Sequence, residues 1–157
     1  MRCLVPWGNL RRGRRVGVDV GTVRVGIALS DPDGLLAFPL ATLAFTDSDE
    51  IAARIVELAR ENEAMEVIVG LPRHLSGAEG VSARAARDVA TRVVALGLSV
   101  RLIDERLTTT SAAHALRGAG KSSREQRKLI DQEAARQILQ FALDSERASD
   151  RPPGVAP

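Results

Sequence analysis

The stretch RVGVDVGTVRVGIALSD, residues 15–31, predicts two β-strands joined by a tight turn. Its first half alternates apolar residues and ends at Gly21, and residues 23–30 are again strand-like, a pattern typical of a hairpin. Residues 35–43 can supply a third strand. Pro39 within that stretch indicates an edge position or a bulge, because proline cannot donate a hydrogen bond to a neighbouring strand.

Downstream of this meander, helical and strand-like periods alternate along the chain. The expected elements are a helix over 49–62, a buried strand over 67–71, a helix over 81–96, a strand over 98–103, a short helix over 109–117 and a final helix over 123–146. Three strands followed by crossover units predict an α/β fold, in which a mixed five-stranded sheet carries helices on both faces.

The length and composition of the chain predict one folded domain between two less ordered ends. The chain has 157 residues and 45% hydrophobic residues, enough for one core and too many for a disordered protein. We expect a loose basic arm over residues 1–13, one domain over 14–147 and a disordered proline-rich tail over 148–157. No apolar run is long enough to span a membrane and no secretory signal is evident, so we expect a cytoplasmic protein without a membrane partner.

The first of three notable acids, Asp19, interrupts the apolar strand at residues 15–20. A lone carboxylate in a central strand is costly to bury unless it is paired or binds a metal. The alternative is that Asp19 caps the turn at Gly21. Glu105 directly follows the strand over 98–103, at a strand end where functional side chains converge in α/β sheets. Its alternatives are an ion pair with Arg106 and a carboxylate at the start of a helix.

Asp131 is the third acid and lies on the final helix. It shares one helical face with Ala135, Ile138 and Ala142, so that an acid occurs on the apolar stripe expected to face the sheet. The alternative is that Asp131 lies at an exposed end of that stripe. If the three acids meet, their oxygens favour Mg²⁺ or Mn²⁺. Two such ions can hydrolyse a phosphodiester, with one activating water and the other stabilising the leaving oxygen.

Four segments resemble motifs of the YqgF/RuvX family. They are Asp19–Asp31, Gly70-Leu71-Pro72 with Gly77, Asp104–Thr109, and Ile130-Asp131 with Ala134-Ala135 and Ile138–Gln140. The segments occur in order and span residues 15–144. The resemblance implies a ribonuclease H-like fold related to Holliday junction resolvases. It also implies a nuclease that matures the 5′ end of pre-16S ribosomal RNA.

The resemblance places the family's catalytic and metal-binding acids at Asp19, Glu105 and Asp131. The basic residues expected to bind substrate are Arg24 and Arg106 within the motifs, with Lys121, Arg124 and Lys128 around the start of the final helix. Net charge is only +2, but all except two of the 22 basic residues are arginines, which bind phosphate with a bidentate fork. Aromatic residues are scarce, so we expect recognition of the backbone and shape of structured nucleic acid.

Other functions compete with this interpretation. The first is cleavage of four-way DNA junctions instead of precursor rRNA, which calls for a homodimer because the junction is twofold symmetric. The second is a nucleic-acid-binding domain without catalysis, although acids that repel phosphate would not help such a domain. Asp19-Val20-Gly21-Thr22 also resembles a phosphate loop of actin-like ATPases, but those folds need two such domains around the nucleotide.

Overall fold

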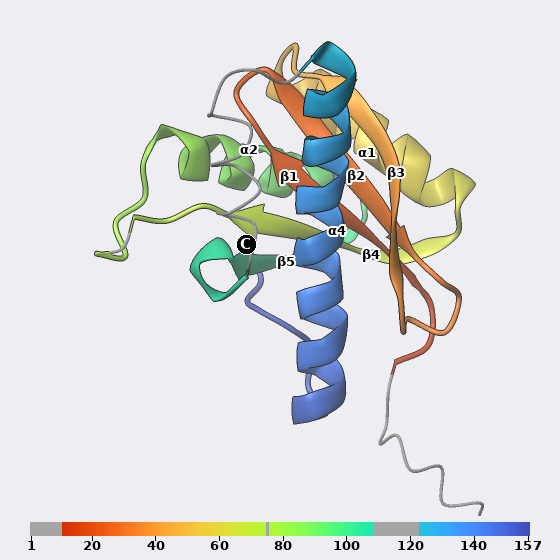
Figure 1. Ribbon diagram of the computed structural model, residues 1–157. Coiled ribbons are helices and arrows are strands. Elements are labelled where there is room, and N and C mark those ends of the chain that lie inside the picture. The colour runs from red at the N-terminus through yellow and green to blue at the C-terminus, as the bar shows by residue number, and fades with distance from the viewer. Residues whose placement is uncertain (1–10, 75, 109–122) are drawn as a thin grey trace, which may run out of the picture.

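The computed structural model describes residues 11–74, 76–108 and 123–157, and a five-stranded sheet forms the centre of this part of the chain. Its strands are β1 (Arg14–Val20), β2 (Arg24–Ser30), β3 (Ala37–Ala44), β4 (Ala64–Leu71) and β5 (Ser99–Asp104), in the spatial order β3-β2-β1-β4-β5 (Figure 1). β1 is antiparallel to β2, and β2 to β3, whereas β4 is parallel to both β1 and β5. The predicted mixed five-stranded sheet is confirmed.

Edge strand β3 accommodates the proline that the sequence places within it. Pro39 lies opposite Ala28, and the register between β2 and β3 shifts between Ile27 and Ala28. Because β3 has a neighbour on one side only, the missing N–H of proline disturbs the sheet little. Both expected features, an edge position and an irregular register, are present.

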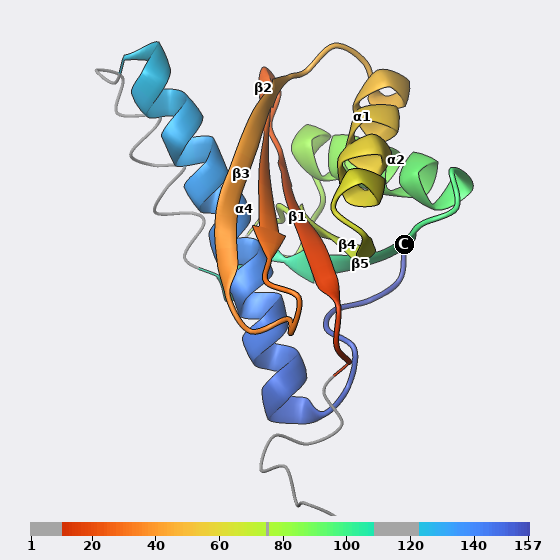
Figure 2. The ribbon, with the colours of Figure 1, turned by 90° about the vertical axis from the view of Figure 1, so that its right-hand side faces the viewer.

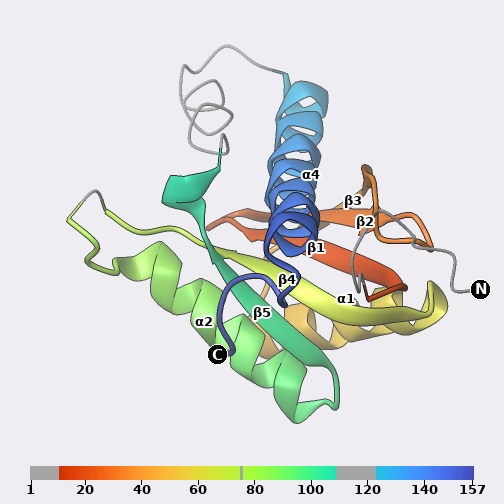
Figure 3. The same ribbon diagram turned by 90° about the horizontal axis from the view of Figure 1, so that it is seen from below.

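Helices cover both faces of the sheet, as predicted. α1 (Ser48–Glu61) and α2 (Val81–Ala95) pack on one face, and α4 (Arg124–Ser149) crosses the other (Figure 2). Figure 3 shows the same arrangement along the sheet, with α4 on the side opposite α1 and α2. Branched strand residues pack against α1 and α2 on one face of the sheet. On the other face, alanine, leucine and isoleucine residues of α4 pack against the strands. The core therefore depends on aliphatic side chains, in keeping with the low aromatic content.

Two glycines let α4 approach the sheet closely. A Cβ atom at Gly26 in β2 would lie 2.0 Å from the carbonyl oxygen of Asp131, and one at Gly17 in β1 would lie 2.9 Å from that of Ala135. Both distances are too short for a real Cβ atom, so any side chain at these positions would push the helix outward. The helix begins with a capping box formed by Ser123 and Gln126.

The C-terminal tail follows a defined path, although its composition predicts disorder. Val155 exchanges two backbone hydrogen bonds with Leu102 of β5, at 2.7 and 3.0 Å. The guanidinium of Arg101 donates to the carbonyl oxygens of Pro153 and Gly154, both at 2.7 Å. β5 is an edge strand, and the tail satisfies backbone groups that this edge would otherwise expose.

Among the described residues, no helix combines the length and the apolar character needed to cross a bilayer. The expected short helix over 109–117 and most of the expected arm over 1–13 lie outside the described residues.

Candidate active site

β1 places Asp19 on the sheet face that α4 covers. A Cβ atom at Gly17 would lie 2.7 Å from the Cβ of Leu139, which identifies this face of the strand. Side chains two residues apart in a strand point to the same face, so Asp19 also faces α4. Asp19 lies within the strand and is 2% exposed. The structure therefore contains a buried carboxylate near the C-terminal end of a central strand.

Asp131 enters the same region from the first half of α4. The backbone of Asp131 packs against Gly26 of β2. Gly26 is paired directly with Asp19 in the β1–β2 ladder. Asp131 is 1% exposed, so it lies at a buried position of the helical stripe and not at an exposed end. Its Oδ2 accepts a hydrogen bond from Nε of Arg24 at 2.6 Å, which forms an ion pair. Asp131 thus lies directly over Gly26, the register partner of Asp19.

Glu105 reaches this region from the end of β5, where it begins the short 3₁₀ helix η1 (Glu105–Leu107). A Cβ atom at Gly70 in β4 would lie 2.6 Å from Oε1 of Glu105. The Glu105 carboxylate therefore lies over β4, in the position that a side chain at residue 70 would occupy. Val18 and Val69 are register partners, which makes Asp19 and Gly70 the next neighbours along β1 and β4. Glu105, itself 6% exposed, therefore points across β4 towards Asp19.

The donor chemistry of this carboxylate site, defined as Asp19, Glu105 and Asp131, suits a hard divalent cation. Three buried carboxylates share one face, and the glycines at 26 and 70 let Asp131 and Glu105 lie close against the sheet there. As the side chains stand, no group of three or more acidic, histidine or cysteine residues in the described ranges is arranged to hold a metal ion. One oxygen of Asp131 is engaged by Arg24. The assignment of these acids as metal ligands stays a prediction.

Basic residues form a hollow next to Asp131. The cationic hollow has a volume of about 430 Å³ and is lined by Val23, Arg24, Thr42, Leu43, Ala44, Arg124, Arg127 and Lys128. It contains the predicted substrate-binding residues Arg24, Arg124 and Lys128 and no acidic residue of the described chain. Arg127, which also lines the hollow, was not among the substrate-binding residues predicted from the sequence. Its spacing from Arg124, three residues along a helix, is the signal that places both on one face.

The remaining two predicted substrate-binding residues differ in their placement. Arg106 does not pair with Glu105, the alternative considered from the sequence, but forms a two-pronged ion pair with Asp104, the shortest contact being 2.6 Å. This guanidinium holds the pKa of the Asp104 carboxyl below its usual range. Arg106 is exposed and borders the loop at Gly77. Lys121 lies outside the described residues.

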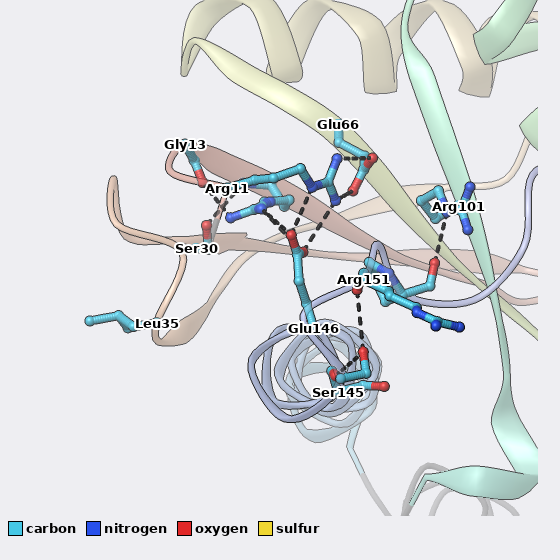
Figure 4. Close-up of polar contacts among 12 residues, drawn as sticks. Arg11, Gly13, Ser30, Leu35, Glu66, Arg101, Ser145, Glu146 and Arg151 are labelled. Carbon is cyan, nitrogen blue, oxygen red and sulfur yellow. Dashed lines mark hydrogen bonds and ion pairs between the residues drawn. The ribbon is translucent and has the colours of Figure 1, made fainter. Parts of the chain in front are cut away.

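A second buried ionic group lies at the other end of α4 and was not foreseen from the sequence. This arginine–glutamate cluster consists of Arg11, Arg15, Glu66 and Glu146 (Figure 4). Arg11 donates to Glu66 at 3.0 Å and to Glu146 at 2.7 Å, and Arg15 donates to Glu146 at 3.2 Å. Although Arg15 follows other arginines near the start of the chain, it is 1% exposed.

Hydrogen bonds and burial have opposite effects on the two arginines of the arginine–glutamate cluster. The hydrogen bonds that Arg11 donates to Glu146 and Glu66 raise the pKa of Arg11, whereas burial lowers the pKa of Arg15. Because side chains alternate between the two faces of a strand, the sequence indicates that Arg15 and Asp19 share a face. It also indicates that Glu146 lies on the helical stripe that begins at Asp131. What the sequence could not show is that Arg15 and Glu66 are register partners.

Comparisons with known proteins agree with this architecture. A family model described as RuvX, Holliday junction resolvase, matches residues 13–145. A Streptomyces coelicolor protein named "Putative pre-16S rRNA nuclease" is 49% identical over 149 residues, covering 93% of this chain and 89% of the relative. A Mycobacterium ulcerans protein of the same name is 53% identical over 138 residues, covering 87% of this chain and 81% of the relative.

Solved structures give the same fold at low sequence identity. T. thermophilus RuvC in complex with a Holliday junction substrate superposes with a TM-score of 0.55 and 17% identity, covering 87% of this chain and 97% of RuvC. This likeness supports the ribonuclease H-like fold predicted from the sequence.

Proposed function

The chain belongs to the RuvX family of Holliday junction resolvases, and from this premise we propose that it is a metal-dependent endonuclease acting on structured nucleic acid. One observation carries the proposal: β1, the end of β5 and α4 direct three buried carboxylates to one face of the sheet, beside a cationic hollow. Burial of three acids in one region is costly unless cations compensate them. A divalent ion would supply such positive charge, and the cationic hollow beside the acids would hold the phosphates of a substrate.

In the proposed reaction, Asp19, Glu105 and Asp131 hold Mg²⁺ or Mn²⁺. When bound, the metal supplies a nucleophilic water and stabilises the oxygen that leaves the phosphodiester. Asp19, from the central strand, lies between the acids contributed by β5 and α4 and would hold the metal together with them. The surrounding apolar core keeps the carboxylates fixed in position before substrate arrives.

The cationic hollow is proposed to hold backbone phosphates of the substrate. Arg124, Arg127 and Lys128 lie on the first two turns of α4, and their positive charges are not offset by an acidic residue in the described lining. The backbone carbonyl of Lys128 accepts a hydrogen bond from Thr42, which joins this part of α4 to β3. The hollow is thus built on a helix and a strand. Phosphate contacts of this kind position nucleic acid without reading its sequence.

We take precursor 16S rRNA, cut near its 5′ end, as the physiological substrate. Relatives about half identical to this chain over most of its length are named "Putative pre-16S rRNA nuclease". Cleavage of four-way DNA junctions is the second candidate, because the matching family model is described as a Holliday junction resolvase. The junction candidate requires a homodimer, which the mass of the protein in solution would reveal. A cytoplasmic location remains part of the proposal.

The proposal is tested by incubating the protein with Mg²⁺ or Mn²⁺ and either a labelled 5′ fragment of precursor 16S rRNA or a labelled four-way DNA junction. Asp19→Asn should reduce cleavage by about 10³-fold, since metal catalysis supplies several kcal/mol and each ~1.4 kcal/mol is tenfold. Glu57→Gln, which alters an exposed acid of α1, is the matched control and should cleave like wild type.

Each outcome of this assay has a definite meaning. Preference for the rRNA fragment supports precursor processing, and preference for the junction supports resolution. Binding of either substrate without metal-dependent cleavage would favour the non-catalytic alternative. Equal cleavage by Asp19→Asn and wild type would contradict the proposed site.

A further inference from the structure

Arg24 is shared between the two parts of the candidate active site. It is the first residue of β2, its Nε donates to Asp131 at 2.6 Å, and the same side chain lines the cationic hollow. Its side chain is 20% exposed, while that of Asp131 is 1% exposed. Arg24 therefore connects a buried carboxylate on one side with a solvent-facing group of cations on the other.

The ion pair and a metal ion compete for the same carboxylate. Oδ2 of Asp131 accepts the Arg24 hydrogen bond, and a guanidinium at this distance would repel a divalent cation placed on the same acid. In the absence of metal, the arginine compensates a buried negative charge that would otherwise be costly. The pairing thus stabilises the metal-free protein at the expense of metal binding.

A phosphate in the cationic hollow offers Arg24 a second partner. Arg124, Arg127 and Lys128 surround the hollow together with Arg24, so an anion bound there lies within the field of all four cations. Arginine forms strong bidentate contacts with phosphate oxygens. Among the described residues, the guanidinium of Arg24 makes its one hydrogen bond through Nε, so its terminal amino groups can meet a phosphate.

We propose that Arg24 exchanges Asp131 for a backbone phosphate of the nucleic acid, and that this exchange makes Asp131 available to a divalent cation. The inference rests on the proposed function and adds an order of events to it. Nucleic acid binds the cationic hollow first, Arg24 turns towards the phosphate, and the metal then binds the carboxylate site with higher affinity. By reciprocity, metal bound at the site strengthens nucleic acid binding by the same factor.

The exchange is tested by measuring Mn²⁺ affinity without nucleic acid, by titration calorimetry or by electron paramagnetic resonance of free Mn²⁺. Arg24→Gln removes the competing cation and should bind Mn²⁺ about tenfold more tightly than wild type, a change of ~1.4 kcal/mol. Arg54→Gln is the control, because it removes an exposed arginine of α1, on the opposite face of the sheet from α4, and it should bind Mn²⁺ like wild type. Measuring without nucleic acid excludes any contribution from metal bound to substrate phosphates.

Thermal unfolding provides a second readout. Arg24→Gln should have a lower Tm than wild type in EDTA, and Mn²⁺ should raise its Tm by more than it raises that of wild type. Arg24→Lys keeps a positive charge but loses the guanidinium fork, so it should have an intermediate Mn²⁺ affinity. This variant remains informative if Arg24→Gln does not fold without metal.

The possible failures can be told apart. Mn²⁺ binding by wild type that is unchanged or weakened in Arg24→Gln and Arg24→Lys would overturn the exchange while leaving the nuclease proposal intact. Absence of Mn²⁺ binding in all variants, with or without a nucleic acid that resists cleavage, would overturn the exchange and the metal-dependent function together.

Discussion

The two ends of α4 each bury an acid, yet they differ in what surrounds it. Asp131 and Glu146 lie fifteen residues apart on one helical stripe, about 22 Å along the axis at 1.5 Å per residue. Glu146 belongs to a cluster in which two glutamates meet two arginines. Asp131 belongs to a region with three buried carboxylates, where Arg24 provides the described ion pair.

This difference separates a structural group from a candidate for chemistry. Balanced charges in the arginine–glutamate cluster fix the ends of β1, β4 and α4 relative to one another and leave little net charge to attract a ligand. The three carboxylates gathered at the other end are the oxygen ligands that a divalent cation prefers, and the cationic hollow lies beside them. Burial alone therefore does not identify an active site, and the balance of charge among the buried groups must be examined.

The largest expected change in stability follows loss of Arg15. Arg15→Gln leaves Glu66 and Glu146 with Arg11 alone, and removing one member of a buried ionic group costs about 3 to 5 kcal/mol of unfolding free energy. Arg54→Gln, which breaks an exposed pair with Glu57, is the control and should cost less than about 1 kcal/mol. Urea unfolding of both variants measures the difference. Equal losses would show that the cluster is not the structural support described here.

A smaller loss is expected where α4 approaches the sheet. Gly26→Ala places a methyl group against the backbone of Asp131, which must move, so we expect about 1 to 3 kcal/mol of destabilisation and loss of cleavage. Gly70→Ala meets the side-chain ends of Ile138 and Glu105, which can turn aside more easily. Gly70→Ala should therefore lose cleavage with the smaller loss of stability. The free energy of unfolding and the cleavage rate are measured for both variants. A larger loss of stability in Gly70→Ala than in Gly26→Ala would contradict the packing at Asp131.

Changes in the cationic hollow should affect binding and leave stability nearly unchanged. Arg127→Gln combined with Lys128→Gln removes two exposed or half-buried cations, and the free energy of unfolding should change by less than about 0.5 kcal/mol for each. Nucleic acid affinity should fall, and the slope of log affinity against log salt should decrease by about 2, or about 1 per phosphate contact. An unchanged slope would show that these residues do not contact phosphate.

Local patterns in the sequence were sufficient to predict most of the sheet and the burial of Asp131. Strand alternation over 15–31 predicted β1 and β2, and the helical stripe from Asp131 predicted which side of α4 faces the sheet. Contacts between distant segments could not be predicted, because they depend on strand register and tertiary packing. The pairing of Arg15 with Glu146 and the path of the tail along β5 are of this kind.

The comparison of the two ends of α4 is tested most directly by Asp131→Asn and Glu146→Gln, which neutralise equivalent acids on one helix. Each variant is assayed for Mn²⁺-dependent cleavage per folded molecule and for its free energy of unfolding. Asp131→Asn should lose cleavage by at least about 10²-fold, the equivalent of ~2.7 kcal/mol. Glu146→Gln should keep cleavage within about threefold while losing about 3 to 5 kcal/mol of stability. Full cleavage by Asp131→Asn, or loss of cleavage by folded Glu146→Gln, would contradict the assignment of chemistry to one end and structural support to the other.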